Sequence, residues 1–236
     1  MRMLCTICAR SGSKGLKNKN FLKINGKTLI SRCINQALKI KKITNVVVSS
    51  DAKKFRKISN KKIFYINRPK KLSSDRSGKI DVIRHALKKS ELHFKKKFDT
   101  VIDLDVSSPL RKNKDVEKSI SLFKKKNPNN LITICKARKN PYFNMIQFKN
   151  NKYDYVKKIK KKILRRQDAP KVYEMNASIY IWNKKYLIKS SQLFSKNTVC
   201  YEMPYNRSID IDSKDDFEIV KIFIKKNEKR FFKFKK

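Results

Sequence analysis

Short apolar runs alternate with amphipathic segments along most of the chain. The runs have the length and the β-branched composition of strands, and they cover Met3–Cys8, Thr44–Ser49, Ile63–Ile66, Thr100–Leu104, Asn130–Cys135, Ala177–Trp182 and Arg207–Ile211. The segments between them predict helices over Leu29–Lys39, Lys53–Ser59, Lys79–Lys89 and Lys114–Lys126, and a last helix from about Lys214. Apolar strands separated by helices are typical of a mainly parallel sheet covered on both faces. We therefore predict an α/β fold.

One domain accounts for the whole chain of 236 residues, with an excursion inside it. Residues 136–170 differ in character from the rest, because they contain scattered aromatic residues, an Asn150-Asn151 turn signal and a cationic run over 157–166. We interpret this segment as a β-rich arm that leaves the sheet. In a parallel sheet, ligands bind beyond the carboxyl ends of the strands. The loop after the first strand, Ser50-Asp51 and residues 105–111 are all predicted at that edge.

Residues 9–20 form the most informative segment, and they read Ala-Arg-Ser-Gly-Ser-Lys-Gly-Leu-Lys-Asn-Lys-Asn. Two of the four glycines of the chain, Gly12 and Gly15, lie here among four basic residues. Glycine permits positive φ angles, so successive N–H groups can converge on one anion. The spacing excludes the P-loop of nucleoside triphosphatases and the three-glycine dinucleotide motif. We predict a polyphosphate-binding loop; the alternative is a basic surface loop.

Two pairs of aspartates have the spacing of a shared face. In a strand, Asp210 and Asp212 project on the same side, roughly 7 Å apart, and such carboxylates can hold Mg²⁺. The alternative is that Asp212 caps the last helix. In the second pair, Asp105 lies at the predicted ligand edge and Asp103 lies within a strand, which favours a structural role.

Arginines are the natural partners of phosphate and carboxylate groups. Arg68 and Arg111 are candidate anion contacts at the ligand edge. Arg166 could contact a substrate carboxylate, although a solvated basic stretch explains it nearly as well. His85 has the position of a helix residue near the core, and no pattern for covalent nucleophilic catalysis is evident.

The formal charge of +43 invites a nucleic-acid interpretation. The lysines are spread over the whole chain, however, and no nucleic-acid-binding module is present. We therefore attribute the charge to composition bias and expect no specific nucleic-acid partner, only salt-sensitive affinity for polyanions.

Five scattered cysteines predict reduced thiols and a cytoplasmic protein. Cys5 and Cys8 are three residues apart in a predicted strand and so on opposite faces, which argues against a metal or redox pair. We expect no secretion signal, because Arg10 interrupts the first apolar run, and no membrane span.

Six motifs, in order, resemble those of the acylneuraminate cytidylyltransferases, which activate nonulosonic acids such as sialic, legionaminic or pseudaminic acid as CMP-sugars. They are Ala9–Gly15 with Lys19-Asn20, Val46–Asp51, Arg68-Pro69 through Asp81 with His85-Ala86-Leu87, Ser107–Arg111, Arg166-Gln167 through Tyr180, and Asp210–Asp212. The resemblance covers nearly the whole chain.

This resemblance implies a Rossmann-like homodimer in which residues 136–170 reach across to the partner subunit. It implies that Arg10, Lys19 and Asp212 are catalytic and that Asp210 and Asp212 bind Mg²⁺. The anomeric hydroxyl of the sugar attacks the α-phosphate of CTP, and positioning and charge neutralisation lower the barrier. The residues that it implies for CTP and the acidic sugar are Ser11, Gly12, Ser13, Lys14, Gly15, Asn20, Arg68, Asp105, Arg111, Arg166, Gln167 and Asn176.

The chain departs from the family pattern at three places. Asp105 stands where the family usually has Gln, which suggests a third carboxylate at the metal. Ala177 replaces a usual Gly, and Gly78-Lys79 replaces a small-polar pair near the expected base pocket. The identities of the sugar and, in part, of the nucleotide therefore remain open.

Three alternatives to this function follow from the sequence. One is a 3-deoxy-manno-octulosonate cytidylyltransferase or another sugar nucleotidyltransferase, although Ser107-Ser108-Pro109 stands where the former usually has Gly-Asp-Glu-Pro. The second is a polyanion-binding protein. The third is a catalytically inactive relative, and the intact loop and aspartates argue against that one.

Overall fold

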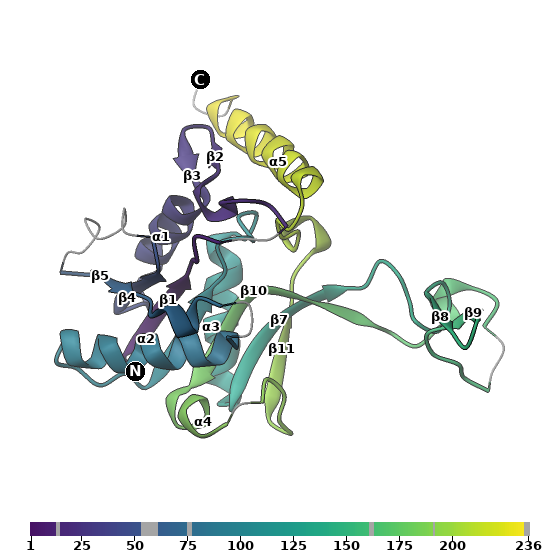
Figure 1. Cartoon of the computed structure of the whole chain (residues 1–236), viewed down its shortest axis with the longest axis horizontal. Coiled ribbons are helices and arrows are strands. Elements are labelled where there is room, and N and C mark those ends of the chain that lie inside the picture. The colour runs from purple at the N-terminus through teal and green to yellow at the C-terminus, as the bar shows by residue number, and fades with distance from the viewer. Residues whose placement is uncertain (13–14, 53–60, 75–76, 161–162, 191, 234–236) are drawn as a thin grey trace.

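A seven-stranded, mainly parallel sheet forms the centre of the protein (Figure 1). The structure is a computed structural model that describes residues 1–12, 15–52, 61–74, 77–160, 163–190 and 192–233. The predicted helix over Lys53–Ser59 therefore lies outside the described residues, as do Ser13 and Lys14. In spatial order the strands are β11 (Thr198–Glu202), β7 (Asn130–Lys136), β10 (Tyr173–Asn183), β6 (Thr100–Leu104), β1 (Met3–Cys8), β4 (Asn45–Ser50) and β5 (Ile63–Asn67).

Only β10 among these strands runs antiparallel to its neighbours, β6 and β7. The pairs β1–β4, β1–β6, β4–β5 and β7–β11 are all parallel. The predicted α/β class with a mainly parallel sheet is confirmed.

Helices cover both faces of the sheet. Successive residues of a strand point to opposite sides, so each strand contributes apolar side chains to two clusters. One buried cluster joins Met3, Cys5 and Ile7 to α1 (Leu29–Lys39), α3 (Asn113–Lys126) and α5 (Lys214–Lys233). The other cluster joins the intervening Leu4 to α2 (Lys79–His93) and α4 (Lys184–Lys189). Within the described residues, no helix combines the length and apolar character that a bilayer crossing requires.

A two-stranded hairpin, β8 (Ile146–Lys149) and β9 (Lys152–Tyr155), lies away from the sheet at the end of a long excursion (Figure 1). Its turn residues Asn150 and Asn151 have φ angles of 52° and 59°, and two positive φ angles in a two-residue loop are those of a type I′ turn. The predicted β-rich excursion is thus present. Its apolar side chains face solvent; Phe148 is 62% and Tyr153 73% exposed.

The strand predicted over Arg207–Ile211 is wrong. A 3₁₀ turn occupies Tyr205–Arg207, and the chain then continues without regular structure to the start of α5. The segment is held by single contacts, among them the Ile211 N–H, which donates to the Ser107 carbonyl at 2.9 Å. Asp210 and Asp212 therefore do not share a strand face.

Candidate active site

A cavity of about 500 Å³ opens at the carboxyl ends of β1 and β6. Its walls come from five parts of the chain, namely the end of β1 with the loop that follows it, the segment after β5, the start of α2, the segment after β6 and the segment that leads into α5. The lining residues are Cys8, Arg10, Gly15, Lys19, Asn20, Arg68, Leu72, Ser74, Ser77, Lys79, Val82, Asp105, Ser107 and Asp212. The predicted ligand edge of the sheet is therefore a real concavity.

The basic loop meets the later of the two aspartates, Asp212, in this cavity. The Lys19 ammonium donates to the Asp212 carboxylate at 2.7 Å and to the Ile211 carbonyl at 2.9 Å. These residues are 193 positions apart in sequence. The fold thus places a cation and a carboxylate side by side at the mouth of the cavity.

Gly15 is required for space and not for its φ angle. A Cβ atom at this position would lie 2.4 Å from the Asp212 carbonyl oxygen, closer than real Cβ contacts allow. Neither Gly12 nor Gly15 has a φ angle in the left-handed range, and among the described residues of this loop Asn18 has one, 55°. The loop therefore does not use the positive φ angles that glycine permits at these two positions. Nothing in the structure explains Gly12.

Ser11 and Asn20 hold the loop in place. The Asn20 side chain donates to the Arg10 carbonyl at 3.0 Å, which ties the two ends of the loop together. Ser11 donates its N–H and its hydroxyl to Asp51, each at 2.7 Å. Asp51 was predicted at the ligand edge, and here it anchors the loop to the end of β4.

Asp210 and Asp212 differ in surroundings. Burial and the nearby Asp212 charge raise the pKa of Asp210, whereas the Asp212 side chain is 72% exposed. The capping alternative for Asp212 is wrong, because Ser213 and Asp216 form the capping pair of α5. The Ser213 N–H donates to the Asp216 carboxylate at 2.8 Å, and the Asp216 N–H donates to the Ser213 hydroxyl at 3.2 Å. The Asp212 carboxylate is left to Lys19 and the cavity.

Two neighbouring carboxylates, one of which raises the pKa of the other, suit a hard divalent cation. Among the residues that the structure describes, no group of three or more His, Cys, Asp or Glu side chains is arranged to hold a metal. Asp105 therefore does not add the third carboxylate that its sequence position suggested. The donor set fits an ion such as Mg²⁺, which binds through one or two carboxylates together with substrate phosphates.

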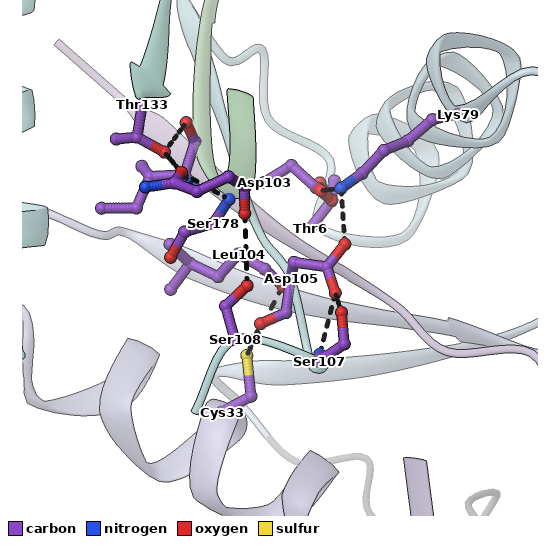
Figure 2. Close-up of polar contacts among 12 residues, drawn as sticks. Thr6, Cys33, Lys79, Asp103, Leu104, Asp105, Ser107, Ser108, Thr133 and Ser178 are labelled. Atoms are coloured by element: carbon purple, nitrogen blue, oxygen red, sulfur yellow. Dashed lines mark hydrogen bonds and ion pairs between the residues drawn. The ribbon is translucent and has the colours of Figure 1, made fainter. Parts of the chain in front are cut away.

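Asp105 is instead bound within the wall of the cavity (Figure 2). One carboxylate oxygen accepts from the Lys79 ammonium at 2.8 Å, and the other accepts from the N–H and hydroxyl of Ser107 at 2.8 and 2.7 Å. Lys79 also contacts the buried Asp103 at 2.9 Å. Burial raises the pKa of Asp105, but the Lys79 charge and hydrogen bond outweigh it and hold that pKa well below its usual range.

Two arginines predicted to bind anions lie at the edge of the sheet, and each guanidinium donates hydrogen bonds to other residues of the protein. Arg68 lines the cavity and is 6% exposed, and its guanidinium donates to the Ser49 carbonyl at 2.7 Å. Arg111 is buried and donates to the Ser178 carbonyl at 2.6 Å and to Gln36 at 2.9 Å. It lines a neighbouring cavity of about 460 Å³ beside α1, so its observed contacts are structural.

Three other predicted residues of the second half of the chain, Arg166, Gln167 and Asn176, do not line this cavity. Arg166 and Gln167 line a separate cavity at the base of the arm, where Arg166 donates to the Arg138 carbonyl at 2.6 Å. Asn176 is buried, accepts from Thr133 at 2.7 Å and donates to Ser208 at 2.9 Å. It fastens the start of the segment that carries Asp210 and Asp212.

The sequence pattern did not indicate Lys79 as a site residue, nor Ser107 as the donor that fixes Asp105. The one available signal was that Lys79 and Asp105 both stand at departures from the family pattern. The structure brings these two departures into contact.

Comparison with known proteins agrees with this geometry. The family model described as "Cytidylyltransferase" matches residues 4–234. The chain is 44% identical over 225 residues to the CMP-N,N'-diacetyllegionaminic acid synthase of Campylobacter jejuni, covering 94% of each chain. It is also 44% identical over 226 residues to the post-translational flagellin modification protein B of Campylobacter coli, covering 94% of this chain and 95% of the relative.

A solved structure shares the fold. It is the CMP:2-keto-3-deoxy-manno-octonic acid synthetase complexed with CTP, with a TM-score of 0.68 and 17% identity over 96% of this chain and 100% of that one. The chain therefore belongs to the cytidylyltransferase family.

Proposed function

We propose that this cytidylyltransferase transfers CMP from CTP to a nonulosonic acid of the sialic, legionaminic or pseudaminic type and releases pyrophosphate. The observation that carries the proposal is the contact of Lys19 with Asp212 at the mouth of a polar cavity. The legionaminic acid synthase that is 44% identical supports the acceptor class.

The chain's residues account for binding and for charge. Arg10 and Lys19 supply cations for the triphosphate, and Gly15 lets the loop approach the aspartate segment closely. Bound Mg²⁺, held by Asp210 and Asp212, would supply further neutralisation of phosphate charge. The anomeric oxygen of the sugar forms a bond to the α-phosphorus, and the bond from that phosphorus to the bridging oxygen of pyrophosphate breaks. Preorganised charge and alignment lower this barrier without a covalent enzyme intermediate.

A homodimer completes the proposal. Arg166 and Gln167 lie at the base of an arm that extends away from the sheet, in a cavity separate from that of Lys19. The hairpin at the end of the arm exposes Phe148, Tyr153 and Ile146, the last being 64% exposed. Exposed apolar side chains on an extended hairpin are typical of an interaction surface, and a second copy of the chain is the proposed partner. Light scattering on the purified protein would measure its mass.

A reducing compartment, the cytoplasm, is the proposed location. All five cysteines are free thiols. Cys5 and Cys33 are buried, and burial raises the pKa of both thiols, which makes them poor nucleophiles.

A substrate panel tests the function. Pyrophosphate release should require a nucleotide, a sugar acid and Mg²⁺ together, and it should stop when EDTA removes the metal and return with added Mg²⁺. Four nucleotides crossed with several sugar acids, including 3-deoxy-manno-octulosonate, distinguish the proposed reaction from that of another sugar nucleotidyltransferase. Absence of turnover with every pair, combined with tight oligonucleotide binding that depends steeply on salt but persists at physiological salt, would favour a polyanion-binding protein instead.

A further inference from the structure

Lys79 occupies an unusual position for a lysine. It is the first residue of α2, where the helix dipole disfavours a positive charge. Its ammonium nevertheless lies within 2.9 Å of Asp103 and 2.8 Å of Asp105, and 4.8 Å from the centre of the Tyr180 ring. Three strand-borne groups therefore surround this single cation, and they explain why it is held against the dipole.

The two carboxylates around Lys79 are not equivalent. Asp103 is fully buried and accepts from the Thr6 hydroxyl at 2.6 Å, so it faces the interior of the sheet. Asp105 is 25% exposed and lines the cavity. An ionised carboxylate has about four acceptor positions, and Lys79 and Ser107 occupy three of those of Asp105. One acceptor position remains for a ligand in the cavity.

The charge of this wall is opposite to that of the phosphate-binding loop. This wall is the cluster of Lys79, Asp103 and Asp105, and its two carboxylates and one ammonium give it a net negative charge. Arg10, Lys19 and other cationic groups line the remainder of the cavity. A neutral amide at position 105 would offer both a donor and an acceptor, whereas an anion offers acceptors only.

We propose that Lys79 is a positioning residue that keeps Asp105 anionic and fixed, so that this wall selects a substrate group that donates a hydrogen bond. The inference rests on the proposed function and deepens it. The donor is either a hydroxyl or amide N–H of the sugar acid, or the exocyclic amino group of the cytosine base. The pair excludes substrates that present an acceptor or an anion at that point.

Steady-state kinetics of three variants tests this proposal. Asp105→Asn keeps the volume of the side chain but removes its charge, Lys79→Gln removes the cation, and Lys79→Arg restores it. A hydrogen bond to a charged group contributes about 1.5–3 kcal/mol, so the KM of the affected substrate should rise about 10- to 150-fold in the first two variants, with a smaller change in kcat. The double variant Asp105→Asn/Lys79→Gln should have a KM no higher than that of the more impaired single variant, because the two residues act as one unit. Lys79→Arg should recover most of the affinity.

The source of the donor is decided by which substrate responds. A raised KM for the sugar acid alone identifies the sugar. A raised KM for CTP, together with improved use of UTP by Asp105→Asn, identifies the base, because UTP has an acceptor in place of the amino group. Either result supports the proposal.

Lys184→Gln is the matched control. Lys184, at the start of α4, pairs at 2.5 Å with Glu91 of α2, the helix that carries Lys79. Its side chain is similarly protected, with 22% exposed, but it does not line the cavity. Its loss should lower stability without changing either KM. The proposal is overturned if folded Asp105→Asn keeps both KM values within about twofold of wild type, or if Lys184→Gln changes them as much as Lys79→Gln does. Pyrophosphate release by the wild-type protein is measured independently. The proposed reaction therefore stands even if the proposed role of Lys79 and Asp105 in substrate selection is overturned.

Discussion

Two lysine–aspartate pairs line the same cavity, and they differ in what surrounds them. The Lys19–Asp212 pair is 2.7 Å long and has an aspartate that is 72% exposed. The Lys79–Asp105 pair has nearly the same length, 2.8 Å, but its aspartate is 25% exposed and a second, buried aspartate shares the lysine. An exposed pair contributes little to stability and exchanges partners readily, whereas loss of one member of a buried pair leaves an uncompensated charge. The same pair of side chains is thus open to solvent in one place and held by several partners in the other.

Removal of Lys19 is expected to have the largest effect, and it falls on activity. Lys19→Ala should lower kcat/KM by about 1000-fold, since a preorganised cation at a reacting phosphate contributes about 4 kcal/mol. The midpoint of thermal unfolding should move little, because the pair is exposed. Lys221→Ala, which breaks the surface pair with Glu218 on α5, is the control and should leave both quantities unchanged. Near-wild-type turnover by Lys19→Ala would remove this residue from the catalytic set.

Gly15→Ala should come next, with a loss of about 100-fold in kcat/KM. The added methyl would lie 2.4 Å from the Asp212 carbonyl, so the loop or the aspartate segment must move, and a displacement of about 1 Å costs this much in rate. Gly12→Ala adds a methyl that meets nothing within 4 Å and should cost less than tenfold. Equal losses in the two variants would contradict the steric explanation.

Lys79→Gln should lower the free energy of unfolding by about 2 kcal/mol at pH 7. This is below the value of a fully buried pair, because Lys79 is 34% exposed. The pKa of Asp105 is depressed in the folded state, so its stabilising contribution is present above about pH 4 and disappears as the pH falls through the folded value. Denaturant titrations at pH 7 and pH 3.5 should show the difference from wild type shrinking at the lower pH. A difference that does not depend on pH would mean that packing, and not charge, explains the loss.

Ala177→Gly is expected to have the smallest effect and the opposite sign. Ala177 has a φ of 49°, a left-handed conformation that costs a residue with a Cβ atom about 1–2 kcal/mol, partly offset by the greater unfolded-state entropy of glycine. The free energy of unfolding should rise by about 0.5 kcal/mol in a denaturant titration, with kcat/KM unchanged. A loss of stability would show that the Ala177 methyl makes packing contacts that outweigh the strain.

The fold was predictable where local sequence determines local structure. Continuous apolar strands and intervening helices placed six of the seven sheet strands, and Asn150-Asn151 indicated the turn of the arm. β11 was missed because Thr198–Glu202 is partly exposed, mixes polar and apolar residues and lies at the sheet edge. The strand predicted around Asp210 failed because its alternation of Ile and Asp arises from a loop that packs Ile211 inward.

The candidate site was predictable only in part. Glycines among cations indicated a loop that lines the cavity, and closely spaced aspartates indicated Asp212, which contacts that loop. Lys79 was not identified, because it is one of 62 basic residues and its distinguishing feature is a long-range contact with Asp103 and Asp105. The structural roles of Arg111 and Asn176 were hidden for the same reason, since their partners come from other elements.

The distance of 193 residues between Lys19 and Asp212 has a consequence for biosynthesis. During synthesis, the first strands and helices are made long before the segment that closes the mouth of the cavity. Contacts between such remote segments form late because chain closure costs entropy. A chain that lacks the Asp212 segment therefore has no complete cavity wall, and the appearance of turnover during refolding should report that this segment has docked.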